Sequence, residues 1–266
     1  MDTVDRLTRE VVVQKLVDAL EPLDYIHAFW EGGAAAFNRI DAWSDVDLYL
    51  VVDDDRADET FLAVERTLQS LSPIKQKYGV LQLPWPGVSQ AFYRLEKASE
   101  YLIIDLAVIK LSSPDKFLEP EIHGNVAFLF NKCDEVKPSK LDKDAMVKRL
   151  KERLRKLGAR FEMFNSFVQK EINRGNSLEA IELYRVVTLA PIVEALRIEH
   201  NAIHHDFKMR YIHYELPAGA IEKLERLYFV KDDEDLQRKY REATEWFHEI
   251  ISEIDQEKME RQFKNL

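Results

Sequence analysis

Two aspartates stand one residue apart at the head of an apolar run, in the segment SDVDLYLVV at residues 44–52. Residues two apart on a β-strand share a face, so Asp45 and Asp47 would point the same way while the alternate residues enter the core. Neighbouring carboxylates repel each other, and burying them unpaired is costly. Arg39 is one candidate partner. A divalent ion is the better one, because Mg²⁺ prefers carboxylate oxygens together with substrate phosphates.

A third carboxylate interrupts the apolar segment YLIIDLAVI at residues 101–109. Asp105 is expensive in such a strand unless its side chain binds something. If this strand lies beside the one that carries Asp45 and Asp47, three carboxylates converge on one point. Two Mg²⁺ ions held by such a triad are the usual apparatus for in-line phosphoryl or nucleotidyl transfer.

A glycine pair, Gly32 and Gly33, precedes the acidic strand. It follows a predicted strand at 25–30 and opens a short helix predicted at 34–41, so backbone N–H groups at the turn could hold phosphate oxygens. A glycine pair is also typical of any tight turn, and an Asp-x-Asp pair occurs at ordinary strand ends. The combination of these features with the later lone aspartate favours the chemical interpretation.

Helix and strand patterns alternate over the first half of the chain, and these elements must position the acids. Helical spacing covers 7–20 and 57–71. Strands are predicted at 25–30, 45–52, 77–83, 89–95 and 100–109. A further apolar stretch, 126–130, either adds an edge strand or packs alone.

The segment 132–144 is polar, contains a proline and lacks apolar periodicity, so we place a domain boundary there. The predicted domains are 1–135, catalytic, and 136–266, a helical substrate-binding domain. Helical patterns in the second half cover 143–173, 177–200, 218–230 and 233–263. The expected fold class is α/β plus α, with a mixed sheet and flanking helices followed by an antiparallel helical bundle.

Composition limits the partners and the compartment. The 266 residues are 46% hydrophobic, which supports a real core, and the single Cys133 excludes a disulfide framework or a multi-cysteine zinc site. No signal-peptide pattern or long apolar stretch is visible, so a cytoplasmic protein without a membrane partner is expected. The net charge of −10 disfavours a nucleic-acid partner. It suits a small cationic substrate, although many ordinary proteins are equally acidic.

The block GGAAAFNRIDAWSDVDLYLVV, residues 32–52, resembles the nucleotidyltransferase (DNA polymerase β-like) superfamily. It is most similar to the branch that modifies aminoglycoside and lincosamide antibiotics, where a Trp-Ser-Asp-x-Asp block is common. The segment IHGNVAFLFNK, residues 122–132, also resembles a stretch that follows the third acidic strand in that branch. The motif resemblance covers residues 25–131, and the helical half matches only in overall form.

This resemblance implies an Mg²⁺-dependent enzyme that transfers AMP from ATP to a hydroxyl of a small molecule such as an aminoglycoside or lincosamide. Asp45 and Asp47 would bind both of two Mg²⁺ ions, and Asp105 would complete one site. Asp105, or a metal-bound hydroxide beside it, would deprotonate the acceptor hydroxyl. The triphosphate would contact Gly32, Gly33 and Ser44. Ala34 departs from the family, which often has Ser or Thr there, so Asn38 or Ser44 would have to supply the missing hydroxyl or polar contact.

The helical half offers Arg185 and Lys208 as candidate nucleotide-binding residues, although ordinary salt bridges would explain both. The histidines at 200, 204, 205 and 213 match no common zinc spacing and favour a polar interhelical loop. Of the three tryptophans at 30, 43 and 85, the last could line an acceptor pocket.

Two alternatives stay open: an antitoxin-like protein adenylyltransferase and a catalytically silent nucleotide-binding module. The intact acidic triad disfavours the silent module. The size of the helical half disfavours the antitoxin type, whose minimal versions lack it. A homodimer is compatible with the sequence.

Overall fold

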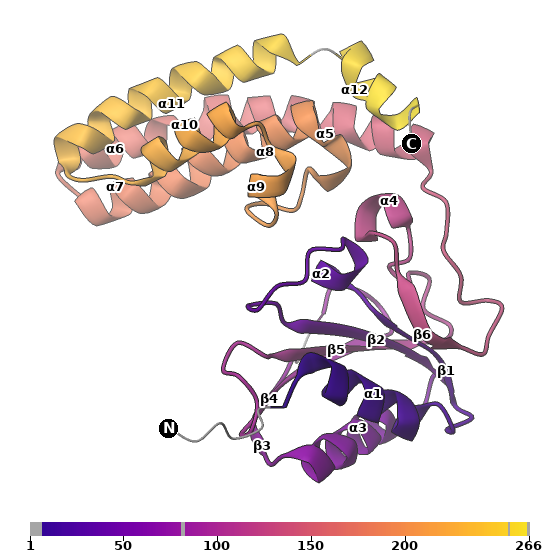
Figure 1. The fold of residues 1–266 in the computed structure, drawn as a ribbon. Coiled ribbons are helices and arrows are strands. Elements are labelled where there is room, and N and C mark those ends of the chain that lie inside the picture. The colour runs from indigo at the N-terminus through magenta and orange to yellow at the C-terminus, as the bar shows by residue number, and fades with distance from the viewer. Residues whose placement is uncertain (1–6, 81–82, 255, 265–266) are drawn as a thin grey trace. The chain divides into compact units, whose positions relative to one another are not determined.

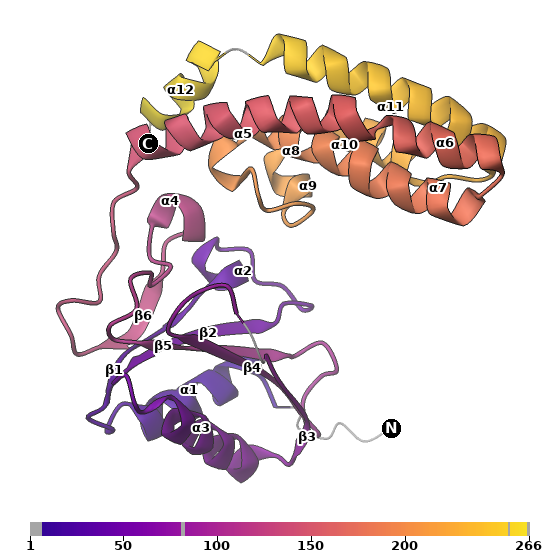
Figure 2. The same cartoon turned by 180° about the vertical axis from the view of Figure 1, so that it is seen from behind.

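The computed structural model describes residues 7–80, 83–254 and 256–264, and the chain forms two compact units, Met1–Lys140 and Leu141–Leu266. Figures 1 and 2 show a sheet with helices in the first unit and helices in the second. Within the described ranges, no helix combines the length and apolar character needed to cross a membrane.

The N-terminal unit is built on a six-stranded mixed sheet with the order β3-β4-β5-β2-β1-β6. Its strands are β1 Ile26–Glu31, β2 Val46–Val52, β3 Ile74–Gly79, β4 Val88–Leu95, β5 Ile104–Lys110 and β6 Ala127–Asn131. β2 and β5 are parallel, and the other neighbours are antiparallel. The stretch predicted at 126–130 is therefore an edge strand, paired with β1.

Two helices, α1 (Arg9–Leu20) and α3 (Ala57–Leu71), cover one face of this sheet (Figure 1). Val46, Leu48 and Leu50 alternate along β2 and are buried in the same core cluster as residues from both helices. The intervening residues of β2 point to the opposite face, because successive side chains of a strand alternate. That alternation leaves Asp47 on the face away from α1 and α3.

In the N-terminal unit three predicted elements differ from the observed ones by more than two residues, and in the second unit the helices predicted at 143–173, 177–200 and 233–263 are each divided into shorter elements. The short helix expected at 34–41 is a single turn, α2 Gly33–Ala36, because Asn38 takes a left-handed conformation (φ 54°) that ends it. β3 begins at Ile74, while residues 81 and 82 of the strand predicted at 77–83 lie outside the described residues. β5 begins at Ile104, since the residues before it form turns. A further turn of helix, α4 Pro120–His123, precedes β6.

The second unit is helical. Its elements are α5 Lys143–Phe164, α6 Ser166–Arg174, α7 Ser177–Leu183, the π-helix η1 Tyr184–Leu189, α8 Ala190–His200, the 3₁₀ turn η2 Ala202–His204, α9 Ile212–Glu215, α10 Ala218–Tyr228, α11 Asp233–Glu253 and α12 Gln256–Lys264. Stacked rings of Phe161 and Phe247, 3.7 Å apart, join α5 to α11 in its core. The predicted fold class, a mixed α/β domain followed by a helical bundle, is confirmed.

The π-helix has a local cause. Pro191 lacks an N–H donor and would clash with the carbonyl of the preceding turn in a regular α-helix. Widening the turn at residues 184–189 relieves that conflict, because π-type turns accommodate an interrupted hydrogen-bond ladder.

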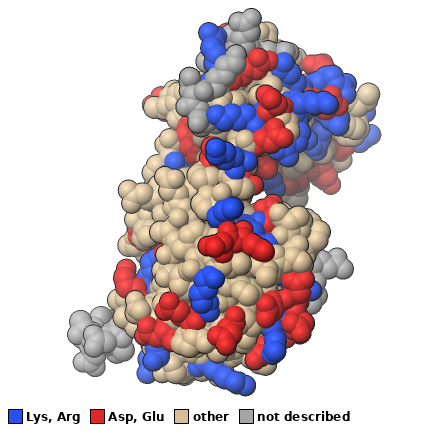
Figure 3. Space-filling view, turned by 90° about the vertical axis from the view of Figure 1, so that its right-hand side faces the viewer, with Lys and Arg blue, Asp and Glu red and all other residues tan. Residues whose placement is uncertain are grey.

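Charge is distributed unequally between the units. The N-terminal unit has 15 Lys and Arg against 24 Asp and Glu, whereas the helical unit has 23 against 24. On the face in Figure 3, basic side chains gather on the helical unit, and acidic side chains form several patches over the N-terminal unit. The formal charge of −10 therefore resides almost wholly in the unit that carries the acidic motifs.

Candidate active site

The sheet brings two of the three predicted acids into direct register. β2 and β5 are parallel neighbours, and Asp47 on β2 is paired with Asp105 on β5. Asp45 lies just before the first residue of β2 and is exposed to solvent. The three carboxylates therefore belong to the same end of two adjacent parallel strands.

Asp105 is partly buried, and its carboxylate accepts a hydrogen bond from a side chain on the neighbouring strand. Gln90, on the neighbouring strand β4, donates a hydrogen bond from Nε2 to Asp105 Oδ1 at 2.7 Å. Burial raises the pKa of Asp105 to about 6; the bond from Gln90 acts against this rise, and the negative charge of Asp45 adds to it. Asp45 and Asp105 thus affect each other electrostatically, as expected for carboxylates brought to one place.

The glycine pair is required by the packing around Asp47. A Cβ atom on Gly33 would lie 1.7 Å from Asp47 Oδ2, and one on Gly32 would lie 2.5 Å from Cε2 of Tyr49. Gly33 also has φ +51°, a conformation that other residues adopt only with strain. The turn can therefore pass over the acidic strand only because neither residue has a side chain.

The turn differs from an ordinary helix N-terminus. The N–H of Gly32 donates to the backbone oxygen of Asp47 at 2.9 Å, which ties the end of β1 to β2. With only one turn, α2 contributes little of the dipole that favours anions at longer helices. Any phosphate contact at this turn would depend mainly on the remaining backbone groups.

Arg9 is a positioning residue that the sequence did not reveal. Its Nη1 donates to the backbone oxygen of Asp45 at 2.5 Å, and its Nη2 pairs with Oε2 of Glu31 at 3.2 Å. The arginine side chain is only 10% exposed, and through it α1 is hydrogen-bonded to the backbone just before β2. Arg39, the predicted cationic partner, places its guanidinium 5.1 Å from the centre of the Phe37 ring.

The loop before β2 is shaped by Ser44, one of the predicted triphosphate contacts. Its hydroxyl donates to Asp41 Oδ1 and accepts from the Asp41 N–H, both at 2.9 Å. This arrangement exposes 68% of Trp43, whose ring meets that of Tyr101 edge-on at 4.8 Å. Each aromatic residue lies three positions before its strand, so the pair flanks the same strand ends as the acids.

The residues fit a divalent cation in chemistry and register. Three carboxylates are the donors that Mg²⁺ prefers, and the pKa of Asp105 is raised mainly by burial and further by the negative charge of Asp45, a charge that a cation would offset. Among the described residues, however, no three Asp, Glu, His or Cys side chains are already grouped as a metal site. Asp105 is instead turned to Gln90.

The remaining predicted contacts belong to the helical unit. Arg185 is exposed on the π-helix, and its charge acts against the rise that burial causes in the pKa of the half-buried Tyr228. Lys208 is exposed and left-handed (φ 52°) and lines a pocket within that unit. No sequence pattern predicted these surroundings of Arg185 and Lys208.

No family model matches the chain, and no curated protein matches it significantly. Similar solved structures include an aminoglycoside 6-adenyltransferase from Bacillus subtilis, with 15% identity, 97% of both chains covered and a TM-score of 0.33. Another is a spectinomycin adenyltransferase from Enterococcus faecialis with ATP and spectinomycin, at 10% identity, covering 92% of this chain and 98% of that one, with a TM-score of 0.36. Both are adenyltransferases. Because both TM-scores are low, functional assignment depends on the residues of this chain.

Proposed function

We propose that this chain is an Mg²⁺-dependent nucleotidyltransferase that moves AMP from ATP to a hydroxyl of a small molecule, such as an aminoglycoside or lincosamide. The observation that carries the proposal is the direct pairing of Asp47 with Asp105 on adjacent parallel strands, beside Asp45. The glycine turn packed against Asp47 and the sequence resemblance of residues 25–131 support it.

Asp45, Asp47 and Asp105 are the residues that would hold the ions. Bound Mg²⁺ would supply positive charge at the phosphate oxygens during the transfer. The acceptor oxygen forms a bond to the α-phosphorus, the bond from that phosphorus to the bridging oxygen breaks, and pyrophosphate leaves.

The acceptor proton needs a base, and Asp105 is suited to that role. Gln90 occupies its Oδ1, so Oδ2 is the atom that would accept the proton. Without the ions, burial raises the pKa of Asp105 to about 6, and bound Mg²⁺ would lower it, so the carboxylate would be ionised at neutral pH and able to accept a proton. Gln90 is then a positioning residue that fixes the orientation of the carboxyl group.

Trp43 and Tyr101 extend the site. Exposed aromatic rings bind flat or apolar groups, and this pair flanks the strand ends that carry the acids. We propose that this aromatic pair binds either the nucleobase or a ring of the acceptor.

One observation favours a second candidate, the silent nucleotide-binding module: the described carboxylates are not already grouped as a metal site. Turnover separates the two candidates. The silent module would bind a nucleotide and release no pyrophosphate under any condition.

The test measures pyrophosphate release with each of the four ribonucleoside triphosphates, Mg²⁺, and a panel of aminoglycosides and lincosamides. Asp47→Asn keeps the side-chain shape but removes one ligand charge, so transfer should fall at least about 100-fold. Asp55→Asn, whose side chain is 87% exposed, is the matched control and should retain the wild-type rate. Equal rates for the two variants would place the chemistry elsewhere.

A further inference from the structure

The helical unit contains a pocket lined wholly by its own residues, one of which, Lys208, the sequence also offers as a nucleotide contact. We propose that it binds a small molecule that joins an apolar body to one anionic group, such as a carboxylate, sulfonate or phosphate. The pocket measures about 710 Å³ and is enclosed by α5, the junction of η1 with α8, the loop at 201–211 and Tyr228. Pockets of this size hold drug-sized ligands. This inference does not rest on the nucleotidyltransferase assignment.

Part of the lining is apolar. Leu157, Pro191 and Val193 are buried at the pocket, and Val186 reaches it from the π-helix. π-type turns occur frequently at functional sites. The pocket therefore lies where the bundle departs from regular helix geometry, and it can accept an apolar body.

One wall of the pocket is a loop held in a strained conformation. Lys208 and Tyr211 both have positive φ, 52° and 63°, although neither is glycine. Arg197, fully buried, donates to the backbone oxygens of Lys208, at 2.7 Å, and Arg210, and pairs with Glu215 at 2.6 Å. Left-handed non-glycine residues persist only where surrounding contacts enforce them, and they cluster at ligand sites. Contacts from the buried Arg197 therefore hold this loop in the conformation that lines the pocket.

A polar atom at this wall lacks a partner. His205 lines the pocket, and its Nδ1 is buried without a hydrogen-bond partner among the described residues. A buried polar atom left unpaired costs about 1–3 kcal/mol, so such an atom usually has a ligand or water to satisfy it. Because this atom is closed to solvent in the structure, it becomes available to an occupant of the pocket only if the imidazole ring turns, so the cavity and its charged side chains carry the proposal.

The charges at the pocket favour an anion. Arg153 is neutralised by a two-pronged pair with Glu194, and the charge of Asp206 also acts on it. Arg160 and Lys208 have no ion pair with any carboxylate in the part of the chain that the structure describes. The lining carries three cations against two carboxylates, Glu194 and Asp206, and this net charge of +1 suits one anionic group and disfavours a polycation.

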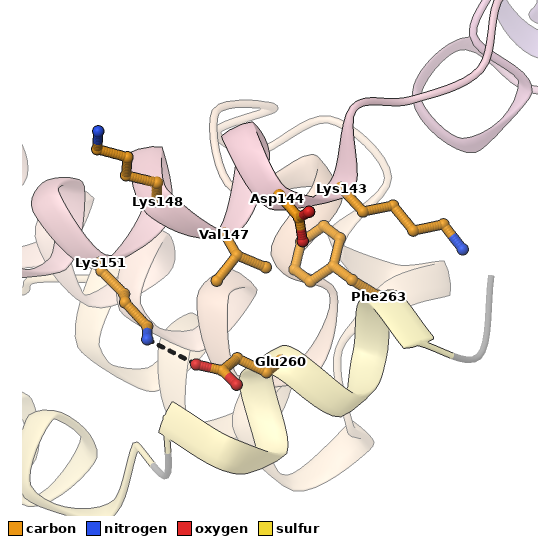
Figure 4. A pocket seen from close by; sticks show the side chains of 7 residues that line it. All are labelled: Lys143, Asp144, Val147, Lys148, Lys151, Glu260 and Phe263. Atoms are coloured by element: carbon orange, nitrogen blue, oxygen red, sulfur yellow. Dashed lines mark ion pairs between the residues drawn. The ribbon is translucent and has the colours of Figure 1, made fainter.

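A second hollow shows the contrast. It measures about 450 Å³ between α5 and α12, and Figure 4 shows three lysines from α5 around it, with Lys151 paired to Glu260 at 2.6 Å. It has neither a strained wall nor a buried unpaired polar atom among its lining residues. That hollow carries no proposal.

The experiment is calorimetric titration of the full chain with 1-naphthoate, with naphthylmethylammonium as the cation of similar body, and with decanoate as a flexible lipid-like anion. We expect one equivalent of anion to bind, and the cation to bind at least about tenfold more weakly. Tighter binding of naphthoate than of decanoate would indicate a rigid metabolite-like ligand, and the reverse order a lipid-like one; either supports an amphipathic anion site. Equal binding of the cation, or no binding of either anion at millimolar concentration, would overturn the proposal.

Variants locate the binding. Arg160→Gln with Lys208→Gln should weaken anion binding about tenfold or more, whereas Arg174→Gln with Lys231→Gln removes the same charge from exposed positions elsewhere and should not. Val186→Trp should block the pocket, and Leu178→Trp, at an 81% exposed position on α7, is its control. Unchanged affinity in both pocket variants would contradict the assignment.

Discussion

The two units of this chain place their charged groups by different means. In the acidic N-terminal unit, backbone register sets Asp47 opposite Asp105, so the hydrogen-bond ladder of the sheet holds the two carboxylates together. In the nearly neutral helical unit, Lys208 stands on a loop that the buried Arg197 side chain holds, while Arg160 projects from α5. The sheet brings together like charges that a bound cation would stabilise. In the helical unit, a buried ion pair between Arg197 and Glu215 helps to hold the loop that lines the pocket.

The largest expected effect tests the helical half of this comparison. Arg197→Met removes the guanidinium from the buried Glu215, which His204 Nδ1 still contacts at 3.0 Å, and takes the donor from the backbone oxygens of Lys208 and Arg210. Stability should therefore fall by about 3–5 kcal/mol. Urea unfolding followed by circular dichroism measures the loss. Adding Glu215→Gln to this variant should recover part of it, because the buried charge is then gone. A loss under about 1 kcal/mol would show that the loop does not depend on the pair.

Gly33→Ala tests the acidic half. The new methyl group would lie 1.7 Å from Asp47 Oδ2 and at positive φ, so Asp47 must move. We expect transfer to fall by about 100-fold with the fold retained, since displaced catalytic geometry is costly. Gly79→Ala, where nothing lies within 4 Å of the added atom, is the matched control. Wild-type turnover in Gly33→Ala would contradict the packing argument.

Asp105→Asn should change the pH dependence of stability. The folded pKa of about 6 exceeds the ordinary value of about 4, so the folded state binds the proton more tightly than the unfolded state. This carboxyl group therefore lowers stability progressively as pH rises from about 4 to above 6. Without divalent ions, the variant should equal the wild type near pH 4 and exceed it by about 1–2 kcal/mol at pH 7, allowing for partial exposure.

Thermal unfolding across this pH range, with Asp55→Asn as the control, measures the difference. Asparagine can still accept the bond from Gln90, so the variant isolates the charge. A variant that is less stable than the wild type at pH 7 in the absence of divalent ions would show that the buried carboxylate is already neutralised by protein groups.

Sequence patterns predicted the elements where local signals were strong. The helix at 57–71 has the predicted bounds, because its apolar spacing is regular and Pro73 follows it closely. Asp105 was recognisable because a carboxylate is conspicuous in an apolar run. The predicted end of the short helix at 34–41 was wrong, because nothing in the sequence marks Asn38 as left-handed.

Other parts of the site depend on distant contacts. Arg9 reaches Asp45 across 36 residues, and an arginine in an amphipathic helix looks like any other surface residue. Gln90 gave no signal because an amide on a strand is common on solvent-facing edges. The helical pocket was invisible for the same reason: the left-handed Lys208 follows from the buried Arg197 and not from its own neighbours.

The most direct test of the central claim is to count the divalent ions that bind at the ends of β2 and β5. Titration with Mn²⁺, followed by electron paramagnetic resonance in the presence of a non-hydrolysable ATP analogue, measures this for the wild type, Asp47→Asn and Asp55→Asn. We predict two bound ions for the wild type and for Asp55→Asn, with weakened binding at both sites in Asp47→Asn. Equal ion binding in Asp47→Asn and the wild type would contradict the assignment of these acids as the metal site of a nucleotidyltransferase.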